Sequence, residues 1–533
     1  MSAGPGLRTA LAGGLLLGLA TPPAAVPFGE WLMLPALAVW FALATTGRRP
    51  ALHSYLFGCV HMAWFSWSVR HVLLPAYVAI VVLGGLYYLL ATLCVRRLSP
   101  AVRSVGFGAA VAGSFWLRAV MPEIHYPHGQ PCHALYQWPS LLRTVAVGGE
   151  PLLNALLAWV AAAGFELWQS WRTASPGWSV ARRRLLASLL VAIGAALAGN
   201  AIVFSAADRG AGPDVRLLLV EPGLRPDDML QVAPGQWRAW VAQFEAERLQ
   251  GPTREALART SGVDLVVWPE SSVQGSLSEE RLAAGGGAVR IGRQSATDAR
   301  LLLGANLRRG DGRTTPAAFL VELPTGEVVG YQAKQRLVPG GEFLPLLGLL
   351  PDAWSSGLAE MFRAALGVLP DCVPGGVRPP LETAGGAPFG ALLCYDNAFP
   401  GPAAAQVERG ATFLVVLSNE AWYRGGGELQ QLVAMTAVRA CENAVPIARC
   451  TMDGWTVWVD AQGRLAGALA LDHGSPEGRA RVQPVTLQPG AGKPPILGWL
   501  RQAMGPGCGL AALLGAAWGW AARRRRRSSL LQA

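Results

Sequence analysis

The sequence predicts a multi-span α-helical membrane domain joined to an α/β domain outside the membrane. Three observations lead to this prediction. Hydrophobic residues make up 52% of the 533 residues and charged residues only 15%, which is too apolar for a soluble domain of this size. Apolar stretches of about 20 residues, the length that crosses a bilayer, fill the first 205 residues. Short β-rich runs that alternate with helical patterns occupy residues 206–500.

Seven apolar stretches near the N-terminus and an eighth near the C-terminus are candidate transmembrane helices. They cover residues 8–24, 30–47, 53–69, 72–96, 104–121, 151–171, 184–204 and 507–522. An alternative for the first is a signal peptide, because Arg8 precedes an apolar core that small residues follow. More spans follow at once, so we expect this stretch to stay on the protein. The predicted domains are 1–205 with about seven transmembrane helices, 206–500 outside the membrane, and 501–533 with a final helix and a basic tail.

Arginine residues indicate the orientation, because positively charged residues concentrate in cytoplasmic loops. If the N-terminus lies inside, every inner loop and the C-terminal tail contain arginine: Arg48 and Arg49; Arg96, Arg97 and Arg103; Arg172 and Arg182 to Arg184; Arg523 to Arg527. Residues 206–500 then lie outside the cytoplasm. This topology explains the net charge of +11 better than nucleic acid binding does, because no basic face is interleaved with aromatic residues.

The eight cysteines divide between the predicted spans and the outer face. Cys59, Cys94 and Cys508 lie in spans, whereas Cys132, Cys372, Cys394, Cys441 and Cys450 face an oxidising compartment. Five is an odd number, so at least one of these should have no disulfide partner within the chain. No CxxC pair and no cysteine-histidine cluster has metal-ligand spacing, and His125 and His128 lie in an aromatic, proline-rich outer loop, so we expect no metal and no other cofactor.

The outer segment predicts an α/β or α+β domain with buried sheets. Its β-rich runs are 215–220, 264–269, 300–305, 317–323, 390–394, 412–419 and 455–460. Helical patterns cover 236–249 and 429–444, and the glycine-rich stretches 284–287 and 425–427 are predicted loops.

Three side chains in this segment are candidates for chemistry. Cys394 ends the apolar run FGALL, and a turn follows it, so the thiol lies where a substrate can reach it. Glu270 follows the strand-like run DLVVWP in the same way. Lys334 is one of only two lysines, with Lys493, in a chain that otherwise uses arginine, which indicates a site that needs a compact ammonium. Taken singly, the cysteine could be core filling and the glutamate a helix cap or a solvated side chain.

Together these segments resemble the Glu-Lys-Cys site of the nitrilase superfamily, in the order WPE, K-x-x-LVP-x-GE and CY[DE]. Seven spans, an outer nitrilase-like domain and a final span resemble the apolipoprotein N-acyltransferase family within that superfamily. The resemblance implies an α-β-β-α sandwich for the outer domain. It also implies that Glu270 is the general base, Lys334 the cation beside the oxyanion and Cys394 the nucleophile, with Glu342 and Tyr395 in support.

The reaction that the resemblance implies is an acyl transfer in two steps at the bacterial inner membrane, with the catalytic domain on the periplasmic face. The cysteine takes an acyl chain from a membrane phospholipid as a thioester. The N-terminal amine of an S-diacylglyceryl-cysteine in an apolipoprotein then accepts it. Neither step needs ATP or a metal, since covalent catalysis divides the exchange into two easier reactions.

Five positions depart from the family's pattern. They are Gly340 for Phe, Asp396 for Glu, Glu420 for Asp, Pro316 near the position of a YN pair, and Met452 for Asn. These departures make the acceptor less certain than the catalysis. Two alternatives therefore stay open: another membrane nitrilase-type amidase or N-acyltransferase with a different amine acceptor, and a non-catalytic membrane scaffold.

The segment 343–370 is too apolar for an ordinary surface loop. One interpretation is a helical hairpin that closes the domain's own core. The other is a mobile lid on the outer leaflet, with Trp354 at the interface and leucines that line an acyl channel toward Cys394.

Overall fold

The computed structural model divides the chain into two compact units. The first comprises 1–203, 426–434 and 494–533, and the second 204–425 and 435–493. The structure describes every residue except 1–3, 22–27, 174–177, 209, 211, 234, 285–297, 324, 367–369, 425, 470–479, 493–494 and 533. The predicted loop at 285–287 and Lys493 therefore lie outside the described residues.

The first unit is built from long apolar helices. These are α1 (Leu7–Ala20), α2 (Met33–Thr46), α3 (Pro50–Phe65), α5 (Leu74–Val95), α6 (Arg103–Val120), α8 (Val145–Thr173), α9 (Trp178–Asp208) and α17 (Pro495–Gln532). Each of the eight predicted apolar stretches overlaps one of them, and residues 22–24 are outside the described residues. The last helix begins at Pro495, earlier than the sequence suggested.

Four of the described helices are long and apolar enough to cross a membrane. They are Gly29–Thr46, Leu74–Val95, Val145–Thr173 and Val180–Ala206, and Leu7–Ala20 is a shorter apolar helix. In Val180–Ala206 only 17% of the most apolar window is buried against the rest of the protein. An apolar helix with so little protein packing is stable in a lipid environment, where its leucines meet acyl chains.

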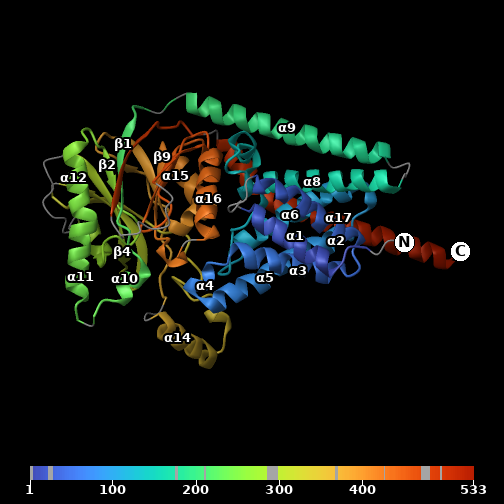
Figure 1. Cartoon of the computed structure of the whole chain (residues 1–533), viewed down its shortest axis with the longest axis horizontal. Helices are drawn as coiled ribbons and strands as arrows, with labels where there is room; N and C mark the ends of the chain where they lie inside the picture. The colour runs from blue at the N-terminus through green and yellow to red at the C-terminus, as the bar shows by residue number, and fades with distance from the viewer. Residues whose placement is uncertain are drawn as a thin grey trace. The chain divides into compact units, whose positions relative to one another are not determined.

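The second unit contains two β-sheets (Figure 1). The first has the order β13-β1-β2-β4-β5-β6, with β3 paired to β4, and the second has the order β12-β11-β10-β9-β8-β7. The strands of the first sheet are β1 (Val215–Glu221), β2 (Leu265–Val267), β3 (Ser276–Ser278), β4 (Arg300–Arg308), β5 (Thr314–Glu322), β6 (Val328–Ala333) and β13 (Arg481–Leu487). Those of the second are β7 (Leu381–Glu382), β8 (Pro388–Leu393), β9 (Phe413–Ser418), β10 (Ile447–Thr451), β11 (Val457–Val459) and β12 (Leu465–Ala468).

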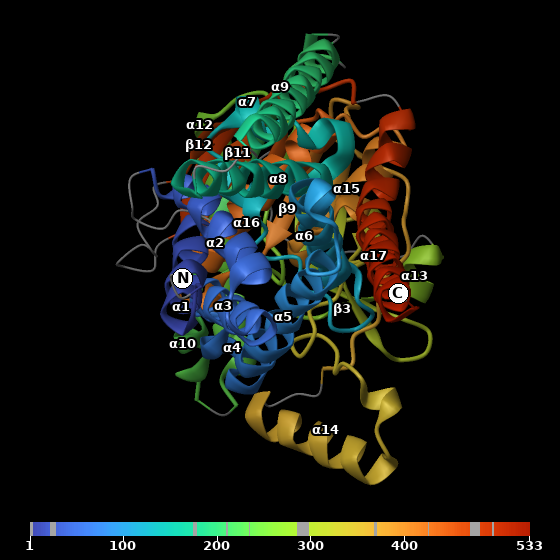
Figure 2. The ribbon, with the colours of Figure 1, turned by 90° about the vertical axis from the view of Figure 1, so that its right-hand side faces the viewer.

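Helices cover the outer faces of the two sheets and make four layers. Figure 1 shows α11 (Trp237–Phe244) and α12 (Gly251–Arg259) beside the first sheet, and α15 (Pro400–Val407) and α16 (Gly427–Asn443) beside the second. Figure 2 shows the same ribbon from the side, with α14 (Asp352–Leu366) as a separate helix. The expected α-β-β-α sandwich is confirmed.

Two hydrophobic clusters hold these layers together. Between the sheets, Leu217 and Leu265 of the first sheet pack with Leu393 and Val415 of the second, and all four are buried completely. The other cluster joins the first sheet to its helices and includes Phe244. Burial of a leucine or phenylalanine side chain contributes about 1.5–3 kcal/mol, so these clusters fix the sheets that present the candidate site.

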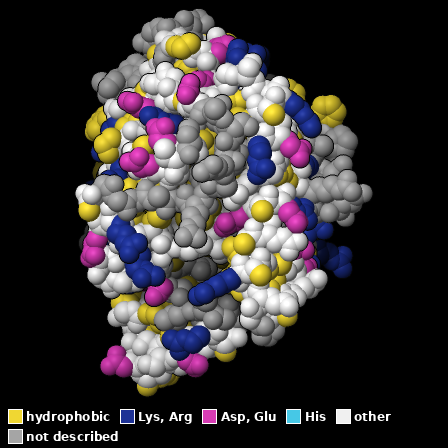
Figure 3. Space-filling view, turned by 90° about the vertical axis from the view of Figure 1, so that its left-hand side faces the viewer, with side chains coloured by type: hydrophobic (Ala, Val, Ile, Leu, Met, Phe, Trp, Pro, Cys, Tyr) yellow, Lys and Arg dark blue, Asp and Glu magenta, His cyan; other side chains and the backbone are white. Residues whose placement is uncertain are grey.

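The surface of the second unit has the mixed charge of a water-exposed protein. On the side that carries α11 and α12, Lys and Arg side chains lie among Asp and Glu side chains (Figure 3). Such a surface suits an aqueous compartment better than a lipid one.

Each of the seven predicted strands overlaps a strand of the structure, although Cys394 is not the last residue of its strand. It begins the 3₁₀ turn Cys394–Ala398, one residue after β8 ends. The predicted helix 236–249 is divided into α11 and a π-helical turn, Glu245–Gln250.

Candidate active site

Glu270 lies in the turn that follows β2. Ser271, the next residue, has a φ of +57°, a conformation that non-glycine residues rarely adopt. The neighbouring strand allows this turn because Gly304 has no side chain: a Cβ atom there would stand 2.6 Å from the Glu270 Cα. The carboxylate is 6% exposed, and its Oε2 accepts a hydrogen bond of 3.2 Å from the Asn419 N–H.

Lys334 follows β6 and is buried between two carboxylates. Its Nζ donates to Glu270 Oε1 at 2.9 Å and to Glu342 Oε1 at 2.6 Å. Burial alone would lower the pKa of this ammonium, but the charges of Glu270 and then Glu342 raise its pKa well above the ordinary value. The side chain, only 1% exposed, is therefore a fixed positive charge at neutral pH.

Glu342 holds the lysine from the other side. Its second oxygen, Oε2, accepts a hydrogen bond of 2.9 Å from the Val338 N–H, which fixes the carboxyl group in the turn after Lys334. Burial raises the pKa of Glu342, and the adjacent Lys334 opposes that rise. The two carboxylates and one ammonium form a network in which the cation cannot change position without loss of both partners.

Cys394 has a strained backbone and a partly buried side chain. Its φ of +43° is unusual for a residue with a Cβ atom, and such strain costs about 1–3 kcal/mol and persists only where the surroundings impose it. Burial and the charge of Glu270 raise the pKa of the thiol to about 12, and Lys334 opposes this rise. The thiol is therefore protonated at neutral pH, and a base must remove its proton when it reacts.

Asp396 joins the cysteine turn to the lysine turn, a role that the sequence did not reveal. Its Oδ1 accepts hydrogen bonds from the N–H groups of Gln335 at 3.0 Å and Arg336 at 2.7 Å, and its Oδ2 from Leu393 at 3.2 Å. Burial raises the pKa of Asp396 to about 7, against the opposing effects of Lys334 and of these donors. Because one carboxyl group holds both turns, the positions of Cys394 and Lys334 depend on each other.

Tyr395 is 4% exposed, and its ring meets that of Phe399 edge to face, with ring centroids 5.0 Å apart. This packing supports the turn that carries Cys394.

A buried ion pair, Arg449 with Glu420, adjoins the end of β9. The Arg449 guanidinium pairs with Glu420 and donates to Ser418 Oγ at 3.0 Å, and neither charged side chain is exposed. Glu420 Oε2 also accepts a hydrogen bond of 3.1 Å from the Trp455 N–H. In the sequence Glu420 stands out only as a departure from the family pattern, because nothing in the spacing shows that Arg449 is its partner.

The other departures also have defined structural places. The Pro316 carbonyl accepts the Lys334 N–H at 2.8 Å, so the backbone next to the cation is held by a residue outside the family pattern. Gly340 has a φ of +79°, which a glycine adopts without strain. The Met452 carbonyl accepts the N–H groups of Gly223 and Leu224 at 2.9 and 3.3 Å.

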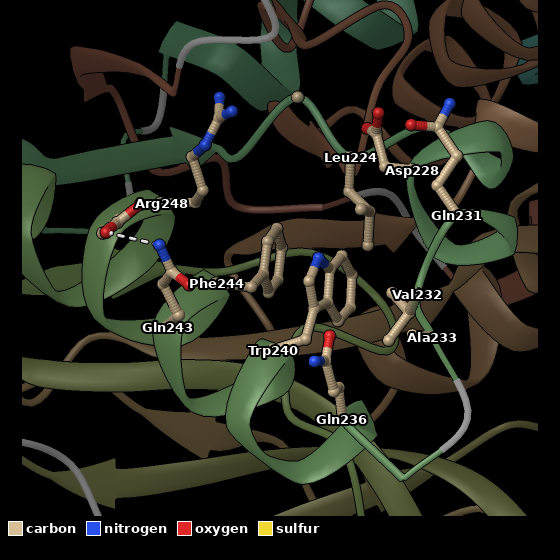
Figure 4. Close-up of a pocket in the computed structure, with 12 residues that line it drawn as sticks. Leu224, Asp228, Gln231, Val232, Ala233, Gln236, Trp240, Gln243, Phe244 and Arg248 are labelled. Carbon is tan, nitrogen blue, oxygen red and sulfur yellow. Dashed lines mark hydrogen bonds between the residues drawn. The ribbon is translucent and has the colours of Figure 1, made fainter.

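A cavity of about 440 Å³ lies on the helical layer of the second unit. Figure 4 shows the rings of Trp240 and Phe244 side by side in this cavity, with Leu224 next to them. The adjoining Glu245 accepts a 3.4 Å hydrogen bond from the N–H of Gln274, in the loop that follows the glutamate of the candidate site. None of the five predicted site residues lines this cavity.

Two family models match the chain. Residues 229–474 match the carbon-nitrogen hydrolase model, and residues 13–163 match the model of the apolipoprotein N-acyltransferase N-terminal domain. The two matches thus define a membrane enzyme of the nitrilase type.

Similar proteins show which branch of the nitrilase superfamily the chain resembles. The apolipoprotein N-acyltransferase of Sinorhizobium medicae is 25% identical over 86% of this chain and 87% of the relative, and that of Gloeobacter violaceus is 27% identical over 86% and 85%. That of Geobacter metallireducens is 32% identical, over 44% of this chain and 43% of the relative's length. The chain belongs to the apolipoprotein N-acyltransferase family and is a multi-pass membrane protein. Among solved structures, Saccharomyces cerevisiae Nit3, of the nitrilase superfamily, is 17% identical with a TM-score of 0.33 over 54% of this chain and 94% of Nit3.

Proposed function

We propose that the protein transfers an acyl chain from a membrane phospholipid, through a thioester on Cys394, to the N-terminal amine of an S-diacylglyceryl-cysteine in an apolipoprotein. The observation that carries this proposal is the buried network of Lys334, Glu270 and Glu342, in which the charges of Glu270 and Lys334 act on the pKa of Cys394. The match of the first unit to the acyltransferase family model supports the same conclusion.

In the first step, Glu270 accepts the thiol proton while the sulfur attacks the ester carbonyl. The thiol's pKa of about 12 disfavours a free thiolate, so proton transfer accompanies the attack. The Lys334 ammonium stabilises the oxyanion of the tetrahedral intermediate as its charge develops. When the intermediate collapses, Glu270 returns the proton to the alkoxide, and a lysophospholipid leaves.

In the second step, the neutral amine of the acceptor attacks the thioester carbonyl and gives its proton to Glu270. Cys394 leaves as a thiolate and takes that proton, so the site returns to its starting state with an amide as product. Lys334 stabilises the same oxyanion position in both steps.

The proposed location is a bacterial inner membrane, with the catalytic domain on the periplasmic face. We propose the boundaries 1–205, 206–500 and 501–533 for the membrane domain, the catalytic domain, and the final helix with its basic tail. In sealed inverted vesicles, protease should then cleave the arginine-rich tail, and in spheroplasts it should leave the tail intact. Cleavage of the tail in spheroplasts would contradict this orientation.

Mass spectrometry of the purified protein after incubation with a phospholipid tests the catalytic proposal. We expect Cys394 to gain one acyl chain, a lysophospholipid to appear, and a diacylglyceryl peptide to remove the acyl group as an amide. Cys394→Ala should form no thioester, and Glu270→Gln should form it at a severely reduced rate. A thioester that passes its acyl chain to other amines but not to the diacylglyceryl peptide would favour a different acceptor. If no thioester forms at all, the protein is better explained as a non-catalytic membrane scaffold.

A further inference from the structure

The first unit contains a buried group of three side chains that can each bind a metal ion. Cys132 and His133 lie in the 3₁₀ turn Pro131–Leu135, and Glu150 lies in α8. One ligand atom from each lies within 4.8 Å of the other two. All three residues are buried, with 5% exposure at Glu150 and none at the other two.

A break in α8 allows Glu150 to reach this group. Gly149 has φ +69° and ψ −172°, a region of backbone conformation that is essentially restricted to glycine. Pro151 follows, and it has no N–H for the helix's hydrogen bonds. The sequence GGEP thus interrupts the helix at the acidic residue, and Glu150 Oε1 lies 2.8 Å from His133 Nε2.

Amide side chains hold two of the three groups from outside. Gln130 Nε2 donates to Glu150 Oε2 at 3.2 Å, and Asn154 Nδ2 donates to Gln130 Oε1 at 2.7 Å. The Cys132 N–H donates to Asn154 Oδ1 at 2.9 Å. Outer hydrogen bonds of this kind orient the ligands in protein metal sites.

The two ring nitrogens of His133 have different surroundings, because only Nε2 faces Glu150. Its Nδ1 is buried and has no hydrogen-bond partner among the described residues, although the imidazole is completely enclosed. An unsatisfied buried polar atom costs about 1–3 kcal/mol. Because Nε2 is the nitrogen that faces Glu150, an ion held by both residues binds at Nε2, and Nδ1 then carries the ring proton.

We propose that Cys132, His133 and Glu150 bind one zinc ion. A thiolate sulfur, an imidazole nitrogen and a carboxylate oxygen are the ligands that zinc takes, at about 2.3, 2.0–2.1 and 2.0–2.2 Å. Tetrahedral binding at these lengths separates ligand atoms by about 3.4 Å, so the group must contract slightly around the ion while the His133–Glu150 contact opens. A water molecule takes the fourth position.

The charge balance favours this ion at a buried place. Zinc binding releases the thiol proton of Cys132 to solvent, and the thiolate and the Glu150 carboxylate then neutralise the two positive charges, with His133 neutral. A neutral complex is buried at far lower cost than separate ions. Calcium and magnesium prefer sites made of oxygen alone, so a thiolate in the set disfavours them and suits zinc. The ion's role is structural, because it ties the 3₁₀ turn to α8.

The test is the zinc content of the full-length protein, purified in detergent without chelators and measured by mass spectrometry. We expect about one zinc ion per chain. Cys132→Ser should lose it, whereas Cys441→Ser, which replaces a buried cysteine of the second unit, should keep it. After exchange with cobalt, the wild type and Cys441→Ser should show a thiolate-to-cobalt absorption band that Cys132→Ser lacks.

A thermal measurement keeps the test decisive if Cys132→Ser folds poorly. A strong chelator should lower the unfolding temperature of the wild type, and added zinc should restore it. The proposal is overturned if the wild type takes up neither zinc nor cobalt, or if Cys132→Ser retains as much zinc as the wild type.

Discussion

Replacement of Gly304 by alanine tests whether the position of Glu270 limits the reaction. Gly304 lies in β4, and a Cβ atom there would stand 2.6 Å from the Glu270 Cα and 2.6 Å from the Pro269 carbonyl oxygen. Ordinary contacts between carbon atoms are about 3.5–4.0 Å, so the glutamate turn has to move by about 0.9 Å. The obstacle is backbone, which a change of rotamer cannot remove.

A displacement of about 1 Å in a catalytic group lowers a rate by about 100-fold. Overpacking adds a cost of about 1–3 kcal/mol, which leaves a domain of ordinary stability folded. We therefore expect Gly304→Ala to form the Cys394 thioester from phospholipid about 100-fold more slowly than the wild type, at a modestly lower unfolding temperature. Rapid-quench mass spectrometry measures the rate, and a thermal scan of the same preparation measures the stability.

Gly401→Ala is the matched control, since a Cβ atom at Gly401 would meet nothing within 4 Å. It should have the wild-type rate. A wild-type rate in Gly304→Ala would refute the assigned importance of the Glu270 position, and an unfolded Gly304→Ala protein would show that the strand cannot absorb the shift.

Three further predictions concern the cation, the thiol and the apolar segment. Lys334→Arg should form no thioester. The lysine nitrogen meets two carboxylates at 2.9 and 2.6 Å in a buried place that a planar guanidinium does not fit. Full activity of this variant would rule out the role assigned to Lys334. The rate of Cys394 alkylation by iodoacetamide should rise about tenfold per pH unit from pH 7 to 10, because a pKa raised to about 12 leaves the thiolate a minor species throughout. A rate that reaches a plateau below pH 9 would contradict this pKa. Changing Leu349, which is 80% exposed, and Leu350 to Ser should leave a folded, membrane-inserted protein that forms thioester slowly from phospholipid but reacts normally with iodoacetamide. Unfolding of that variant would instead place these leucines in a core.

Strong local patterns predicted much of the fold. Apolar stretches long enough to cross a bilayer predicted the helices of the first unit, and β-rich runs predicted strands such as β1 and β9. The pattern missed β13, whose sequence RVQPVTL contains Pro484. Its position at the edge of the sheet explains why it tolerates a proline there, since an edge strand need not donate every N–H. It also missed β6, where Gly330 weakens the strand pattern.

For the candidate site, the sequence by itself determined the chemical groups. The order of Glu270, Lys334, Glu342 and Cys394 in recognisable motifs indicated a base, a cation, a support and a nucleophile, whose roles stay predictions. Glu270, Lys334 and Cys394 each lie shortly after the end of a strand, and Glu342 lies in the turn after Lys334, so a local motif can record their placement.

Only the tertiary structure decided which side chains meet from distant parts of the chain. Asp396 holds backbone groups 60 and 61 residues away, Glu420 meets Arg449 across 29 residues, and Glu150 meets Cys132 and His133 through a break in a helix. No spacing reveals these partnerships, because sheet pairing and helix packing set the distances between segments while local sequence patterns set only the elements themselves. The physical reason is that a strand or helix forms from neighbours along the chain, whereas a buried polar side chain is stabilised by whichever partner the packing brings to it.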